Sequence, residues 1–204
     1  MKLYYSPGAC SMAPHITLNE LGLPYEAVEV DISKTHKLVK TGADYYKINP
    51  KGYVPAIELD DGSVLTEVAA ILQYLADRKP ETGLLAAPGS MERYRTIEWL
   101  TFISSELHKG FGVLWHPPVA EADKQYGVEK LKQRFTLLDK HLANNEFLMG
   151  KQFTVADAYA YTIISWSYFH KLDLNPYPHL RAYMKRIAER PSVRNTAHEE
   201  KLAA

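Results

Sequence analysis

The chain has 204 residues, 46% of them hydrophobic, so it can bury the core of one large domain or two small ones. Lys plus Arg and Asp plus Glu both number 24, and this balance disfavours nucleic acid and anionic membranes as partners. No window approaches the roughly 20 apolar residues of a membrane span, and the N-terminus carries no apolar run typical of a signal peptide, so a cytoplasmic protein is expected.

The chain opens with a strand, a helix and a second strand. Residues 2–5 and 25–30 carry the β-branched and aromatic residues of short strands, and residues 11–21 between them are predicted to be helical. Ser11 is expected to cap this helix, and Gly22 to end it in the left-handed conformation.

A second pair of short strands is predicted further along. Residues 56–59 and 63–65 flank Asp61-Gly62, a tight hairpin signal. A helix then follows from Val68 until Lys79-Pro80 interrupts it. Residues 1–81 are therefore predicted to form a small α/β domain.

The rest of the chain is predicted to be helical. Residues 81–90 indicate a linker, and beyond it apolar residues recur every three or four positions along two long segments, 94–114 and 128–142. Thr154 and Asp157 form a capping box that starts a third helix, and a fourth follows near residue 180. Residues 87–204 are therefore expected to form an all-helical domain.

Cys10 is the only cysteine, which excludes an internal disulfide and a thiolate-rich metal site. It lies in a Gly-Ala-Cys-Ser turn before the first helix, where unpaired amides favour a thiolate. The alternative is a small buried core residue. Ala13 stands where a redox Cys-x-x-Cys pair would need its second cysteine, so only one-thiol chemistry or binding of an external thiol remains.

His108 lies on the predicted long helix with Thr101 and Ser105, spaced four then three residues apart. This polar stripe either faces solvent or contributes to a site. The other histidines are scattered without metal-ligand spacing, so no metal site is expected.

Two turns before predicted elements offer groups to a ligand. Val54 precedes Pro55, and its backbone amide and carbonyl can pair with a peptide. Thr66 and Glu67 head a helix, where free amides attract a carboxylate and the Glu67 side chain accepts from an ammonium group. Glutathione carries a carboxylate, an amine and an amide that complement these features.

The sequence resembles the bacterial beta-class glutathione S-transferases nearly from end to end. The segments that carry the resemblance are MKLYYSPGACSMAPHI, INPKGYVPAIELDDGSVLTEVAAILQYLAD, IEWLTFISSELHKGF and GKQFTVADAYAY. It implies an α+β two-domain fold: a thioredoxin-like βαβαββα glutathione-binding domain followed by an all-α bundle. It also implies a homodimer, glutathione as co-substrate, no metal and a small hydrophobic electrophile as second substrate.

The resemblance also implies a set of site residues. Cys10 and His108 match the residues beside the glutathione sulfur and are the catalytic candidates. Glutathione-binding positions are matched by Cys10, Lys37, Val54, Glu67, Val68, Thr101, Ser105, Glu106, Leu107 and His108. Lys37 matches the basic residue that meets the glycyl carboxylate, in a loop that is lengthened here.

Glutathione conjugation is the function that these matches imply. Two alternatives remain at this stage: a glutathione-dependent disulfide reductase or peroxidase in which Cys10 forms a mixed disulfide, and a binding module without enzymatic activity. Tyr5 and Ser11 are further candidates for holding the thiol. Phe111, Trp115, Trp166 and Tyr168 either line the electrophile pocket or belong to the core.

Overall fold

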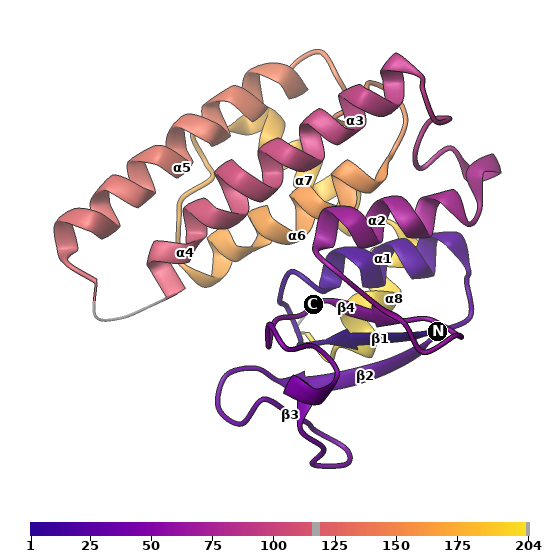
Figure 1. The fold of residues 1–204 in the computed structure, drawn as a ribbon. Coiled ribbons are helices and arrows are strands. Elements are labelled where there is room, and N and C mark those ends of the chain that lie inside the picture. Colours follow the sequence, from indigo (N-terminus) through magenta and orange to yellow (C-terminus); the bar gives the residue numbers. More distant parts are fainter. Residues whose placement is uncertain (116–118, 203–204) are drawn as a thin grey trace. The chain divides into compact units, whose positions relative to one another are not determined.

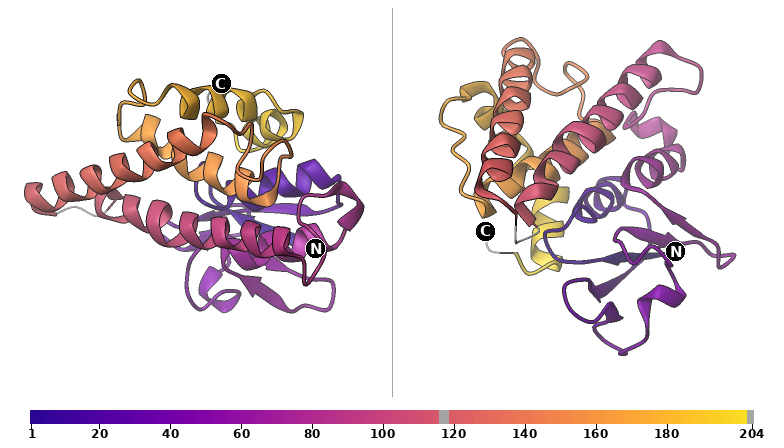
Figure 2. Two further views of the ribbon diagram at one scale, coloured as in Figure 1. Left: turned by 90° about the horizontal axis from the view of Figure 1, so that it is seen from above. Right: turned by 60° about the vertical axis from the view of Figure 1, so that its left-hand side comes forward.

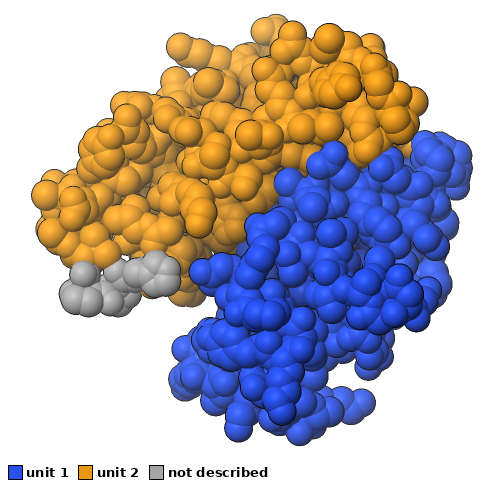
Figure 3. Space-filling model, in the orientation of Figure 1, with its two compact units in different colours: residues 1–82, 190–204 blue, residues 83–189 orange. Residues whose placement is uncertain are grey.

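A computed structural model describes residues 1–115 and 119–202 of the chain (Figure 1). It divides into two compact units, coloured separately in Figure 3. Unit 1 comprises Met1–Thr82 and Arg190–Ala204, and unit 2 comprises Gly83–Glu189.

Unit 1 is built on a mixed sheet of five strands in the order β3-β2-β1-β4-β5. The strands are β1 (Lys2–Tyr5), β2 (Glu26–Asp31), β3 (Lys37–Leu38), β4 (Ala56–Glu58) and β5 (Val64–Thr66). β1 pairs with β2 in parallel, and the other pairs are antiparallel. The predicted βαβ start and the hairpin at Asp61-Gly62 are confirmed.

Helices cover one face of this sheet. α1 (Met12–Leu21) and α2 (Val68–Asp77) pack against each other there, as Figures 1 and 2 show. Side chains alternate between faces along a strand, so Tyr4 points away from these helices and joins a buried cluster with Tyr45 of η1 (Tyr45–Lys47). The second helix of the expected βαβαββα order is thus a three-residue 3₁₀ turn.

The two ends of α1 differ in how well the sequence predicted them. Gly22 ends the helix at φ 58°, in the left-handed region, as predicted. The prediction that the Ser11 side chain caps its start is wrong. Its hydroxyl instead accepts from the Ser6 N–H at 3.1 Å and donates to the Ser6 carbonyl at 3.2 Å, which holds the loop before the helix.

Unit 2 is helical. Its longer elements are α3 (Met91–Phe102), the π-helix η3 (Ile103–His108), α4 (Lys109–Trp115), α5 (Glu121–Leu142), α6 (Val155–Phe169) and α7 (Pro178–Ala188). The predicted segment 94–114 is helical but contains the π-helical turn. α6 is largely buried, and its start shows the predicted capping box of Thr154 and Asp157.

The last helix, α8 (Pro191–Glu199), belongs to unit 1, whereas residues 87–204 were expected to form one helical domain. α8 packs on α1, and hydrogen bonds between side chains join the two helices. Asn19 donates to the Thr196 hydroxyl at 2.9 Å. Glu20 of α1 also accepts from Arg190 and Ser192. In the described residues, no helix has the length and apolarity needed to cross a membrane.

Candidate active site

Cys10 lies in the loop between β1 and α1 and is half-buried. Its thiol donates a hydrogen bond to the carbonyl oxygen of Val54 at 3.1 Å. The structure therefore brings together two of the predicted site residues, which lie far apart in the sequence.

The thiol of Cys10 is neutral at physiological pH. Burial raises its pKa to about 12, and the nearby Glu67 carboxylate adds to the shift. Backbone amides of Cys10 and Ser11 donate toward the sulfur and lower the pKa, as the position at the helix start predicted, but their effect is smaller than that of burial. The expectation that this environment gives a thiolate is wrong, because the effect of desolvation on the pKa outweighs that of the amides.

Tyr5 is one of the two residues whose hydroxyl was a further candidate for holding the thiol. Tyr5 is buried in β1, and its ring packs against His15 of α1 at a centroid distance of 5.3 Å. Burial raises its pKa, as do nearby glutamates. Tyr5 is therefore part of the packing between β1 and α1.

Val54 follows a residue whose backbone carbonyl accepts two side-chain hydrogen bonds. The Val54-Pro55 peptide bond is cis, and the preceding carbonyl of Tyr53 accepts from the Tyr45 hydroxyl at 2.8 Å and from the Asn49 side chain at 2.7 Å. In the described part of the chain, no hydrogen bond engages the Val54 N–H. That amide is therefore available to the carbonyl of a peptide-like ligand.

Glu67 and Val68 form the start of α2. Glu67 precedes the helix at φ 71° and ψ 123°, a conformation that L-residues rarely adopt. Val68 contributes one of the first-turn amides, which carry the positive end of the helix dipole. A carboxylate that accepts an ammonium group thus lies next to amides that attract a ligand carboxylate.

Lys51 joins this corner of unit 1, and sequence reasoning missed it. Its ammonium group lies 2.6 Å from the Glu67 carboxylate and donates to the Thr66 hydroxyl at 3.0 Å. Half of its side chain is exposed. The only signal in the sequence was its place in the motif INPKGYVP, which says nothing of a partner 16 residues away.

Lys37 lies on the short strand β3, at the edge of the sheet, and its side chain is exposed. Its backbone pairs with Asp31 and forms a bridge with Asp44. β3 is joined to the rest of the sheet only through β2, so Lys37 lies three strands away from β4.

The remaining predicted residues lie in unit 2, on α3 and η3. Thr101 and Ser105 are exposed, and each hydroxyl donates to a carbonyl of its own helix, that of Ile97 at 2.9 Å and that of Thr101 at 3.0 Å. A carboxylate oxygen of Glu106 accepts two hydrogen bonds from the Arg134 guanidinium of α5. Leu107 is fully buried, so only its backbone is free to meet a ligand.

His108 is half-buried at the end of the π-helical turn. Its Nδ1 lies 2.7 Å from the Tyr159 hydroxyl, and its ring packs edge-on against Trp166. The four-then-three spacing predicted a continuous polar stripe, but His108 points inward from Thr101 and Ser105 because the π-helix turns more slowly than an α-helix.

Of the four aromatic residues that the sequence left undecided, two are core. Phe111 is fully buried and Trp166 nearly so, whereas Trp115 and Tyr168 are exposed. Trp115 packs edge-on against Trp166 and stacks on Phe169.

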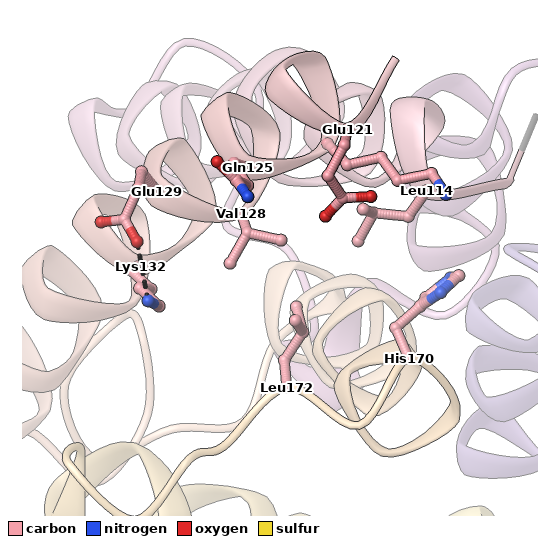
Figure 4. Close-up of a pocket in the computed structure, with 9 residues that line it drawn as sticks. Leu114, Glu121, Gln125, Val128, Glu129, Lys132, His170 and Leu172 are labelled. Carbon is pink, nitrogen blue, oxygen red and sulfur yellow. Dashed lines mark hydrogen bonds and ion pairs between the residues drawn. The ribbon is translucent and has the colours of Figure 1, made fainter. Parts of the chain in front are cut away.

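Unit 2 has a cavity of about 410 Å³ that is lined by none of the predicted site residues (Figure 4). It is lined by Leu114, Glu121, Lys124, Gln125, Val128, Glu129, Lys132, His170 and Leu172. Glu129 and Lys132 form an ion pair at its edge, at 2.7 Å. Within the ranges 1–115 and 119–202, no group of three His, Cys, Asp or Glu residues is placed to hold a metal ion.

Comparison with known proteins identifies the family. The sequence matches the family models of the glutathione S-transferase N-terminal domain over residues 8–78 and C-terminal domain over residues 102–191. It is 46% identical to glutathione S-transferase GstA of Escherichia coli O157:H7, with 99% of this chain and 100% of the relative covered.

Two solved structures have the same fold at 44% identity and a TM-score of 0.95, with complete coverage of both chains. One is a sphingomonad glutathione S-transferase complexed with glutathione, and the other is a bacterial beta-class glutathione S-transferase of Sphingomonas chungbukensis. These matches confirm the expected fold of a thioredoxin-like unit followed by helices. The chain therefore belongs to the glutathione S-transferase family, in its bacterial beta class.

Proposed function

We propose that this protein conjugates the thiolate of glutathione to small hydrophobic electrophiles. The observation that carries the proposal is the arrangement of complementary groups in unit 1. Two amides point toward the Cys10 sulfur at the start of α1, and Val54 presents an N–H. At the start of α2, the Glu67 carboxylate and the first-turn amides can bind the charged end of a ligand.

Each part of glutathione has a partner in this arrangement. The cysteinyl backbone pairs with Val54, the γ-glutamyl ammonium group with Glu67, and the γ-glutamyl carboxylate with the first-turn amides at Val68. Lys37 is assigned to the glycyl carboxylate. The glutathione sulfur then lies beside Cys10.

The neutral thiol of Cys10 gives it a definite role. A free thiol near pKa 8.5 is only a few per cent ionised at neutral pH, and lowering that pKa by about two units is worth roughly 2.7 kcal/mol. A thiol with a pKa of about 12 keeps its proton and donates it in a hydrogen bond. Cys10 can therefore turn from the Val54 carbonyl to the glutathione sulfur and stabilise its thiolate, the reactive nucleophile.

The proposal also includes residues of unit 2, which the resemblance to the family assigns to glutathione. His108 is the second catalytic candidate, oriented by Tyr159. Thr101, Ser105, Glu106 and Leu107 are proposed to meet glutathione, some of them across a homodimer. The electrophile is assigned to exposed aromatic side chains such as Trp115. A cytoplasmic location belongs to the proposal, since glutathione keeps that compartment reduced.

Steady-state kinetics test the proposal. Glutathione would be assayed against aryl halides, peroxides and disulfides, with the parent, Cys10→Ala and Lys37→Ala proteins. We expect conjugation of aryl halides, a lower kcat for Cys10→Ala, and a higher KM for glutathione with little change in kcat for Lys37→Ala. Lys40→Ala is the matched control for Lys37.

Two outcomes would point to the alternative functions. Disulfide reduction that depends on Cys10, with a glutathione adduct on Cys10 in the mass spectrum, would identify a thiol reductase. No calorimetric binding of glutathione at millimolar concentration would favour a binding module.

A further inference from the structure

A buried carboxylate from the last helix contacts the loop that carries Cys10. Glu200, at the end of α8, is almost completely buried, and its Oε2 accepts a hydrogen bond from the Gly8 N–H at 2.8 Å. Gly8 lies two residues before Cys10 and 192 residues before Glu200. Its φ of 69° lies in the left-handed region that favours glycine, so the loop has a specific shape to maintain.

The other oxygen of the same carboxylate holds a buried histidine. Oε1 of Glu200 lies 2.8 Å from Nδ1 of His15, which is fully buried in α1. Nε2 of His15 lies 2.8 Å from a carboxylate oxygen of Glu199, without the alignment of a hydrogen bond. The rings of Tyr5 and Tyr25 flank the imidazole. Both oxygens of Glu200 are therefore engaged, one by the loop and one by α1.

The loop is fixed at two points. The Ser11 hydroxyl bonds both to the N–H and to the carbonyl of Ser6, and Glu200 holds Gly8 between them. The amides of Cys10 and Ser11, which lower the pKa of the Cys10 thiol, lie at the end of this loop. A shift of the loop would therefore move the donors that the proposed function uses for the glutathione sulfur.

We propose that Glu200, supported by His15, is a positioning residue that sets the loop from Ser6 to Cys10 and thereby the placement of the Cys10 thiol and its neighbouring amides. It acts through Gly8 and touches no substrate. The proposal builds on the proposed transferase function for its kinetic consequence, but its structural content concerns unit 1 alone.

The test compares two substitutions that differ in one property. Glu200→Gln keeps an oxygen that can accept from Gly8, and its NH₂ can donate to Nδ1 of neutral His15. Glu200→Met has a similar length and no carboxylate or amide oxygen to take that hydrogen bond. Glu20→Met is the matched control, because Glu20 also links α1 to α8, through Arg190 and Ser192, and forms no hydrogen bond with the loop.

The main measurement is the alkylation rate of Cys10, which is the only cysteine in the chain and needs no transferase activity to report. We expect Glu200→Met to change this rate and to raise the KM for glutathione, each about tenfold, as a misplaced site would. Glu200→Gln should stay within about twofold of the parent, and Glu20→Met should lower the melting temperature while leaving the alkylation rate unchanged. A parent-like rate in Glu200→Met, or an equal change in Glu20→Met, would overturn the proposal.

A second measurement covers the case in which Glu200→Met does not fold. Selective ¹⁵N-glycine labelling of the parent and of Glu200→Gln gives the amide signals of the 11 glycines. The Gly8 amide proton should move upfield when its acceptor loses its charge, and an unmoved signal would refute the contact. A parent protein without transferase activity would defeat the proposed function, yet both measurements would still decide the role of Glu200.

Discussion

The thiol of Cys10 and the carbonyl oxygen of Val54 are joined by a hydrogen bond of 3.1 Å, in which the sulfur is the donor. The bond links the start of α1 to the segment that is proposed to pair with the backbone of glutathione. Together with the pKa of about 12, the bond fits a thiol that donates its proton to a second sulfur and does not itself attack the electrophile.

Cys10 is predicted to react slowly with alkylating agents at neutral pH. With a pKa of about 12, roughly one thiol in 100,000 is ionised at pH 7. Its rate with iodoacetamide should lie at least about 100-fold below that of free glutathione and should still rise above pH 10. A plateau below pH 8 would show a thiolate instead.

The same shift has a consequence for stability. The folded-state pKa of Cys10 exceeds the value of about 8.5 of an unfolded cysteine, so folding favours the protonated form. The stability that the neutral thiol contributes is fully present below about pH 8.5 and is lost as the pH rises toward 12. Urea denaturation of the parent and of Cys10→Ala should therefore diverge in pH dependence only on the alkaline side.

The backbone conformation of Glu67 is predicted to lower the stability of the fold, while its carboxylate is predicted to bind glutathione. Its backbone has φ 71°, which costs an L-residue about 1–3 kcal/mol and costs glycine little. Glu67→Gly should raise the free energy of unfolding by about 1 kcal/mol relative to Glu67→Ala, which keeps the Cβ. Both variants lose the carboxylate and should show the same increase in KM for glutathione.

Chemical denaturation and kinetics on this pair separate the two effects. The ion pair with Lys51 joins exposed groups, so its loss should cost less than about 1 kcal/mol in either variant. Equal stability of the two variants would contradict the strain argument, and an unchanged KM would remove Glu67 from the site.

His108 is predicted to depend on its contact with Tyr159. His108→Ala should lower kcat/KM by about tenfold, as expected for the loss of one hydrogen bond worth about 1.4 kcal/mol. Tyr159→Phe keeps the ring but removes the hydroxyl 2.7 Å from Nδ1, and it should lose part of the same activity. His179→Ala, at an exposed histidine of α7, is the control and should match the parent. Activity unchanged in His108→Ala would exclude the histidine from catalysis.

Asp157 is predicted to stabilise the fold of unit 2 and to have no part in binding glutathione. Its carboxylate accepts from the N–H groups of Leu148 and Thr154, the Thr154 hydroxyl and the Tyr183 hydroxyl, all at 2.8–3.0 Å. Asp157→Asn places an NH₂ group against these donors, which should cost about 3 kcal/mol of unfolding free energy. Glutathione kinetics of the folded variant should be unchanged.

The control for this substitution is Asp123→Asn, on the exposed first turn of α5. Loss of its charge near the helix start should cost less than about 1 kcal/mol. If urea denaturation gave a comparable loss of unfolding free energy in both variants, the hydrogen bonds to Asp157 would not contribute the predicted stabilisation.

Local features were predictable from the sequence because their causes are local. Gly22 ends α1 and the Thr154–Asp157 box starts α6, since both depend on residues within one turn of the helix end. The π-helical turn at Ile103–His108 was not predictable, because one extra residue in a turn has no compositional signature.

The candidate site was predictable in its residues but not in its chemistry. Cys10, Val54 and Glu67 were found from turn and helix-start signals, and the structure joins the first two. The pKa of Cys10 was misjudged because burial comes from segments distant in the sequence. Lys51 and Glu200 were not predicted for the same reason, because each is recognised only by a hydrogen-bond partner that is distant in the sequence.

The placement of α8 in unit 1 bears on how the chain folds during synthesis. The N-terminal sheet and its first two helices emerge from the ribosome early, but the helix that packs on α1 emerges only after all of unit 2. Nascent domains usually fold in the order of synthesis. Here the unit begun first is completed last, and a ribosome-bound fragment that ends before Arg190 would leave the α8-binding side of α1 uncovered.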